Sequence, residues 1–175
     1  MSKLVEGIRA TDHVAGNPEA KVTLVEYGDY QCPYCGMAHP IVKEILAKLG
    51  GEIRFVFRNF PISEIHPHAL HAAAAAEFAA DQGKFWEMHD YIFEHQKALE
   101  DSDLTTYAHH FSLDPVDLIE ALEAPAIADR IQHDFMTGVR SGVNGTPTFF
   151  INGQRHDQSW ELDPLAQALL KAIQQ

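Results

Sequence analysis

The stretch EYGDYQCPYCG, residues 26–36, contains both cysteines of this 175-residue chain. The β-branched run KVTLVEY, residues 21–27, leads into it and predicts a buried strand. Pro33 suits the first turn of a helix, which we expect to end at Gly50-Gly51. A second strand is predicted at EIRFVFRNF, residues 52–60. Together these segments predict a β-α-β unit with parallel strands and a right-handed crossover.

The remainder of the chain divides into a helical middle and a β-β-α end. The middle is rich in alanine and has apolar residues at helical spacing. In TPTFFINGQ, residues 146–154, Asn152-Gly153 is typical of the turn between antiparallel strands, and an amphipathic helix follows. We therefore predict one α/β domain over residues 1–175, with β-α-β at about 12–62, an all-helical insertion at about 63–134 and β-β-α at about 135–175.

Composition excludes several classes of protein. With 13 Lys+Arg against 25 Asp+Glu the formal net charge is −12, which argues against a nucleic-acid partner. No apolar run approaches the roughly 18 residues that a membrane span needs. The first 20 residues lack the apolar core of a signal peptide, so we expect a cytoplasmic chain, or a periplasmic one only if a signal peptide has been removed.

The Cys-Pro-Tyr-Cys sequence allows three interpretations: a static disulfide, part of a metal site or a redox-active dithiol. At the start of a helix, the free N–H groups and the dipole favour a thiolate at Cys32. Cys35 lies one turn further along, where it can attack a mixed disulfide formed at Cys32. This arrangement favours the redox interpretation.

The other two interpretations are weaker. A disulfide in so short a loop constrains the unfolded chain little, and a cytoplasmic chain would keep it reduced. A zinc site needs two further ligands, for which His39 and the group His66, His68 and His71 are available. None of these has the spacing of a zinc finger, so we predict no metal site.

Glu26 is a second candidate functional residue, because it follows the apolar residues Leu24 and Val25 in the first strand. A carboxylate buried there is unfavourable unless it is paired or protonated. Proton transfer with the thiol of Cys35 would give it a role. The alternative is an edge-strand glutamate that faces solvent.

The motifs together resemble the DsbA-like thiol–disulfide oxidoreductases of the thioredoxin superfamily. The resemblance covers most of the chain, from about Asp12 to the final helix, and is strongest at residues 16–36, 55–61, 72–93 and 142–154. It implies a thioredoxin fold interrupted by a helical insertion. The chain is more similar to stand-alone or transporter-fused cytoplasmic-type members than to the secreted oxidant.

The resemblance assigns roles residue by residue. Cys32 matches the nucleophile, Cys35 the resolving thiol and Glu26 the buried acid. Pro147 matches a cis-proline that packs against the cysteines, and the backbone of Thr146 pairs with substrate in the family.

Pro33 and Tyr34, between the cysteines, form part of the implied substrate-binding surface. The Pro-Tyr pair is that of glutaredoxins, whereas the secreted oxidant has Pro-His. Because of this difference, the resemblance implies neither a strongly stabilised thiolate nor a strongly oxidising potential for this chain.

The sequence thus predicts an enzyme that exchanges disulfides with protein or small-molecule thiols and is recycled by a redox partner. No bound cofactor is expected, although glutathione could act as a co-substrate. The alternatives are a glutathione-linked reductase or transferase on the same fold, and a non-catalytic peptide-binding or chaperone module.

Overall fold

A five-stranded mixed sheet forms the centre of the computed structural model, which describes residues 2–175. The strand order is β1-β3-β2-β4-β5, with β2 and β3 parallel and every other neighbouring pair antiparallel. The strands are β1 (His13–Gly16), β2 (Val22–Gly28), β3 (Ile53–Asn59), β4 (Thr148–Ile151) and β5 (Gln154–Arg155).

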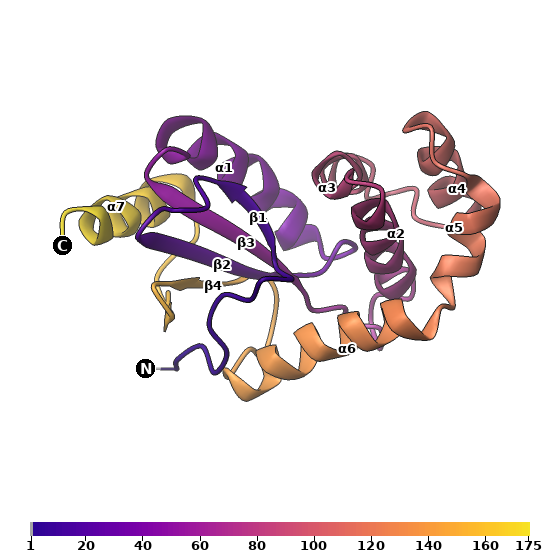
Figure 1. Cartoon of the computed structure of the whole chain (residues 1–175). Coiled ribbons are helices and arrows are strands. Elements are labelled where there is room, and N and C mark those ends of the chain that lie inside the picture. Colours follow the sequence, from indigo (N-terminus) through magenta and orange to yellow (C-terminus); the bar gives the residue numbers. More distant parts are fainter. Residues whose placement is uncertain (1) are drawn as a thin grey trace.

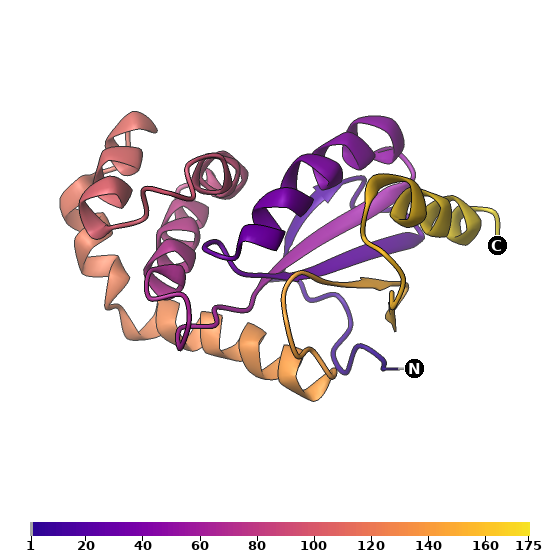
Figure 2. The ribbon, with the colours of Figure 1, turned by 180° about the vertical axis from the view of Figure 1, so that it is seen from behind.

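Three helices cover the sheet. Helix α1 (Pro33–Leu49) connects β2 to β3 and lies on the same face as α7 (Leu162–Ile173), while α6 (Pro125–Arg140) lies on the other face (Figure 1). The view from behind shows the same layers, with the insert joined to the sheet through β3 and α6 (Figure 2). The predicted β-α-β and β-β-α halves with a helical insert, the arrangement of a thioredoxin fold, are therefore confirmed.

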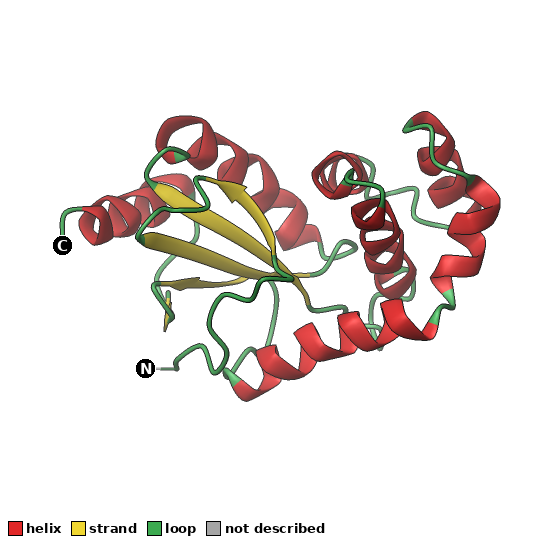
Figure 3. Cartoon of the chain, viewed as in Figure 1, coloured by secondary structure: helices red, strands yellow, loops and turns green. Residues whose placement is uncertain are grey.

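The inserted helices stand together beside one end of the sheet (Figure 3). They are α2 (Ala69–Asp81), α3 (Phe85–Glu94), α4 (Asp101–His110) and α5 (Pro115–Leu122). Helix α6 then runs without a break from the insert to the face of the sheet, so the predicted boundary near residue 134 falls inside a helix. One continuous element thus ties the insert to the second half of the fold.

Strand β1 was not predicted from the sequence. Its four residues, HVAG, are too few and too mixed to show a strand pattern. They pair antiparallel with β3, from His13 opposite Phe57 to Gly16 opposite Arg54. The free edge of β3, rather than local propensity, decides that this segment is extended.

The hairpin between β4 and β5 follows the prediction. Asn152 and Gly153 have φ angles of 48° and 77°, the positive values that a type I′ turn requires. No helix within residues 2–175 is long and apolar enough to cross a membrane.

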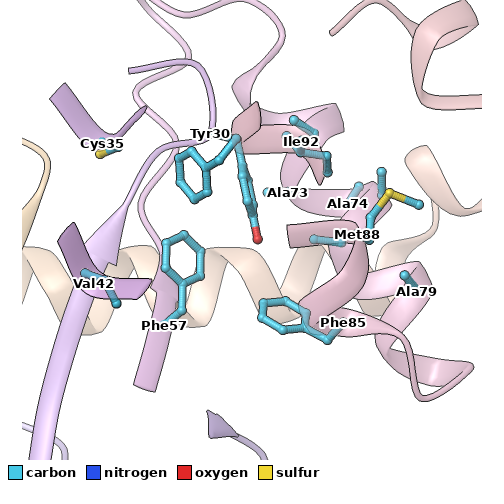
Figure 4. Packing of buried hydrophobic residues seen from close by; sticks show 14 of the residues in the cluster. Tyr30, Cys35, Val42, Phe57, Ala73, Ala74, Ala79, Phe85, Met88 and Ile92 are labelled. Carbon is cyan, nitrogen blue, oxygen red and sulfur yellow. The ribbon is translucent and has the colours of Figure 1, made fainter. Parts of the chain in front are cut away.

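The main core joins the sheet to the insert. Figure 4 shows Tyr30 and Phe57 between the segment that carries Cys35 and the inserted helix α3, which carries Met88 and Ile92. All five side chains are at most 1% exposed. This shared core holds the insert against the end of the sheet at which α1 begins.

Candidate active site

The two cysteines lie at the N-terminus of α1 in unequal surroundings. Cys32 is the N-cap residue, with its sulfur 3.4 Å from the carbonyl oxygen of Thr146. Cys35 lies one turn into the helix and is completely buried, whereas Cys32 keeps 5% of its surface exposed. Both thiols are free. Of the pair, Cys32 is therefore the one that a reaction partner can reach.

The surroundings shift the two thiol pKa values in opposite directions. The pKa of Cys32 is lowered to about 5, first because the thiol of Cys35 donates a hydrogen bond to it, and further by the side chain of Thr146 and the N–H groups of Tyr34 and Cys35. Burial raises the pKa of Cys35 well above its ordinary value. At neutral pH Cys32 is a thiolate and Cys35 a thiol. The thiolate is stabilised without a histidine between the cysteines.

Glu26 lies beneath the pair on β2 and is 3% exposed. Burial raises its pKa to about 8, and the negative charge of Cys32 contributes. The charge of Glu26 in turn helps to raise the pKa of Cys35. Gly28 leaves space for this carboxyl, since a Cβ there would come within 3.1 Å of Glu26 Oε1 and 2.4 Å of the Phe57 ring. The structure places Glu26 inside the protein and in electrostatic contact with both sulfurs.

The segment before β4 forms the opposite wall of the site. The Thr146–Pro147 peptide bond is cis, as predicted, and both residues are half-buried. The carbonyl oxygen of Thr146 faces the sulfur of Cys32, and a hollow of about 190 Å³ extends from Pro147 toward Trp160. The structure therefore brings this late motif to the helix N-terminus 114 residues earlier in the chain.

Asp29 organises the loop before α1, although sequence reasoning did not single it out. Its buried carboxylate accepts hydrogen bonds from the N–H groups of Gln31 (2.8 Å), Cys32 (3.2 Å) and Ile62 (2.8 Å). His66 Nδ1 lies 2.8 Å from the same carboxylate. Three N–H groups from two separate loops thus converge on one side chain. The signal in the sequence was an aspartate three residues before the N-cap residue Cys32, because aspartate side chains commonly accept hydrogen bonds from N–H groups a few positions further along the chain.

Gln96, just after α3, is the second residue that the sequence did not reveal. Its Nε2 donates to the carbonyl oxygens of Tyr30 (2.7 Å) and Cys32 (2.9 Å). Gly36 allows this approach, because a Cβ there would lie 1.9 Å from Gln96 Oε1. No local pattern links Gln96 to the cysteines, since the contact exists only because the insert folds against the loop.

Apolar side chains border the site on the solvent side. Tyr34 is 61% exposed and Met37, one turn further along α1, is 59% exposed. Pro33 is exposed beside them. Of these three, Met37 was missed by the sequence analysis. The exposed apolar surface next to a reactive sulfur suits contact with an apolar partner.

Comparisons with known proteins agree with this geometry. A family described as Thioredoxin matches residues 9–171, so the chain belongs to the thioredoxin family. A thioredoxin-like oxidoreductase from Silicibacter pomeroyi superposes with a TM-score of 0.85 at 29% identity, covering 95% of each chain. Wolbachia pipientis α-DsbA1 superposes with a TM-score of 0.82 at 21% identity, covering 95% of this chain and 93% of that one. The chain therefore has the thioredoxin fold with the helical insert of DsbA-like structures, and its Cys32–Cys35 pair lies at the N-terminus of the first helix of that fold.

Curated relatives contain the same domain within larger proteins. The protein named Na⁺/H⁺ antiporter NhaA 1 of Salinispora arenicola is 48% identical over 162 residues, which are 93% of this chain and 25% of that protein. The antiporter NhaA of Herminiimonas arsenicoxydans is 41% identical over 150 residues, 86% of this chain and 24% of that protein. This chain therefore spans about a quarter of the length of these relatives.

The first prediction concerns the reactivity of the thiols. We expect iodoacetamide to modify Cys32 with a rate that rises through a midpoint near pH 5, because only the thiolate reacts. Cys35 should remain unmodified in the folded protein at neutral pH. Peptide mapping by mass spectrometry measures both rates. A midpoint in the ordinary range of a thiol, or faster modification of Cys35, would contradict the assigned environments.

The second prediction concerns Glu26. Its carboxyl loses its proton near pH 4.5 when unfolded but near pH 8 when folded. Between these values the folded state binds more protons, so this group lowers the free energy of unfolding as the pH rises, by up to about 1.4 kcal/mol per pH unit. The stability of Glu26→Gln relative to wild type should therefore increase over this range.

Denaturant unfolding of the two reduced proteins at several pH values measures this difference. Because the pKa of Cys32 is lowered by folding, this thiol increases the free energy of unfolding as the pH rises. Wild type and Glu26→Gln both contain Cys32, so its effect largely cancels in the difference between them. Glu64→Gln, at an exposed position, is the control and should show no such trend. A constant difference between Glu26→Gln and wild type would show that Glu26 titrates normally.

The third prediction concerns Gln96. Gln96→Ala removes two hydrogen bonds to the loop, which should lower the free energy of unfolding by about 1–3 kcal/mol. Because the first turn of α1 loses a support, the midpoint of Cys32 alkylation should also move to higher pH. Lys97→Ala, at the exposed neighbouring position, should change neither quantity. A loss of stability with an unaltered alkylation profile would make Gln96 a purely structural residue.

Proposed function

We propose that the protein exchanges disulfides with cysteine-containing polypeptides, with Cys32 as the attacking and Cys35 as the resolving residue. The observation that supports this proposal most directly is that, at one helix N-terminus, the pKa of Cys32 is lowered while the pKa of Cys35 is raised. Exchange requires one sulfur that is a thiolate at the start and a second that stays protonated until the mixed disulfide has formed.

In the reducing direction, the thiolate of Cys32 attacks a disulfide of the substrate. A bond forms between Cys32 and one substrate sulfur, and the other substrate sulfur leaves as a thiolate. Cys35 then loses its proton and attacks Cys32, which releases the second substrate thiolate and leaves the Cys32–Cys35 disulfide. Two electrons have passed from the dithiol to the substrate. The oxidising direction is the reverse.

Glu26 is suited to accept the proton of Cys35 at the second step. While Cys32 is a thiolate, its charge helps to raise the pKa of Glu26 and of Cys35. In the mixed disulfide that charge is gone, so both pKa values fall. The carboxylate becomes available as a base at the stage when the thiol of Cys35 must ionise.

A polypeptide substrate is supported by the surroundings of Cys32. The backbone of Thr146 lies beside the sulfur and could pair with an extended chain, in the manner of strand addition. Exposed Tyr34 and Met37 offer apolar contact to the residues that flank the substrate cysteine. The expectation of a cytoplasmic chain and of a separate recycling partner stays a prediction.

The fourth prediction tests this function. Cys35→Ser should form a lasting mixed disulfide through Cys32 with a disulfide-containing peptide, because the resolving thiol is absent. Mass spectrometry of the intact protein measures the adduct, and Cys32→Ser, as the control, should form none. Wild type should pass through the same adduct without accumulating it.

The alternatives give different results in the same experiment. An adduct with glutathione disulfide but with no peptide would indicate a glutathione-linked enzyme. No adduct with either, together with suppression of aggregation by Cys32→Ser, would indicate a binding or chaperone module. Equilibration with a glutathione buffer gives the reduction potential, in which about 30 mV corresponds to 1.4 kcal/mol.

A further inference from the structure

A second cluster of chemically active side chains lies between α1 and α3. It consists of His39 on α1 and of His89 and Asp90 on α3. One ring nitrogen of each histidine and one carboxylate oxygen of Asp90 all lie within 4.8 Å of one another. His39 is one turn beyond Cys35, but the mechanism proposed above does not use any of these three residues.

The distances suit the ligands of a metal ion. His39 Nε2 and Asp90 Oδ1 are 3.6 Å apart. In a tetrahedral zinc site with bonds of about 2.0–2.1 Å, neighbouring ligand atoms are about 3.3 Å apart. The 3.6 Å between these two atoms is too long for a direct hydrogen bond. A small movement of either side chain would let both atoms bind one ion.

His39 Nε2 is a buried ring nitrogen with no hydrogen-bond partner. The whole residue is only 7% exposed. Such unpaired buried polar atoms are rare in proteins because they lose the hydrogen bonds of water without replacement. The ring stacks on Phe93, with centroids 5.0 Å apart, which keeps this nitrogen directed at the cluster. A bound ion would satisfy it.

The other two residues are held as metal ligands usually are. His89 Nδ1 lies 2.9 Å from the hydroxyl of Tyr30, and this contact orients the ring and sets its tautomer. Lys43 Nζ donates a hydrogen bond of 2.8 Å to Oδ2 of Asp90, so the other oxygen, Oδ1, is left facing His39. Glu94, 3.5 Å from Lys43, offsets the charge of that lysine.

The state and the accessibility of the cluster also suit an ion. The rings of His39 and His89 are both buried, at 7% and 3% exposed, so each can present a ring nitrogen to an ion away from bulk water. The side chain of Asp90 is 35% exposed and gives a path from solvent. Two imidazoles and one carboxylate are a donor set that zinc and similar divalent transition metals accept, with a fourth position left for water.

We propose that His39, His89 and Asp90 bind one divalent transition-metal ion, such as zinc, between α1 and α3. The ion would join the helix that carries the two cysteines to the helical insert. This site is separate from the cysteines and goes beyond the proposed exchange reaction.

The test is calorimetric titration of the oxidised protein with zinc alone, since the Cys32–Cys35 disulfide then removes both thiols as ligands. We expect one ion per chain and a thermal unfolding temperature that rises with zinc concentration. His39→Phe keeps the aromatic stacking and Asp90→Asn keeps the shape, and each should weaken binding by at least about tenfold. Cobalt in place of zinc should give the visible absorption bands of a tetrahedral site.

The matched control is His71→Ala. His71 also lies beside two carboxylates, Asp101 at 2.7 Å and Glu123 at 3.3 Å, but its own side chain is 30% exposed and both carboxylates are more exposed still. This variant should bind zinc as wild type does. The proposal is overturned if oxidised wild type binds no zinc, if His71→Ala abolishes binding, or if folded His39→Phe and Asp90→Asn retain full affinity. Circular dichroism establishes that each variant is folded.

Discussion

The first turn of α1 is packed between the end of the sheet and the helical insert, and the properties of both cysteines follow from that packing. It removes Cys35 from water and leaves Cys32 at the helix N-terminus, where N–H groups and the thiol of Cys35 stabilise a thiolate. The negative charge of Glu26 adds to the effect of burial on the pKa of Cys35. The difference between them arises from burial and from the direction of hydrogen bonds, which the surrounding fold imposes.

The helical insert acts on the site through a few polar contacts across an apolar core. Gln96 donates a hydrogen bond to the carbonyl oxygen of Cys32, and Nδ1 of His89 is hydrogen-bonded to the hydroxyl of Tyr30. In the proposed metal site, His39 and His89 would add a third connection between α1 and the insert. A movement of the insert would therefore reach the loop before Cys32 through these specific contacts, of which the one between His89 and Tyr30 is fully buried and has no water to replace it.

Much of the site could be predicted because its chemistry is local. The two cysteines share one helical turn, and Glu26 interrupts an apolar strand, so each is visible in a window of a few residues. Pro147 was found through its resemblance to a family motif. Gln96 and Asp90 could not be found in this way, since a glutamine after a helix and an aspartate within one are ordinary surface residues until the partner segment is known.

The sequence by itself determined the helix that begins at the dithiol, the parallel crossover, the Asn152-Gly153 turn and the presence of a helical insert. These depend on periodicity and turn chemistry, which act over a few neighbouring residues. Only the tertiary structure decided that β1 is a strand, that α6 runs from the insert onto the sheet, and that Gln96 and Thr146 meet Cys32. Those contacts join residues 64 and 114 positions from Cys32, and they exist because burial of the shared core brings distant segments together.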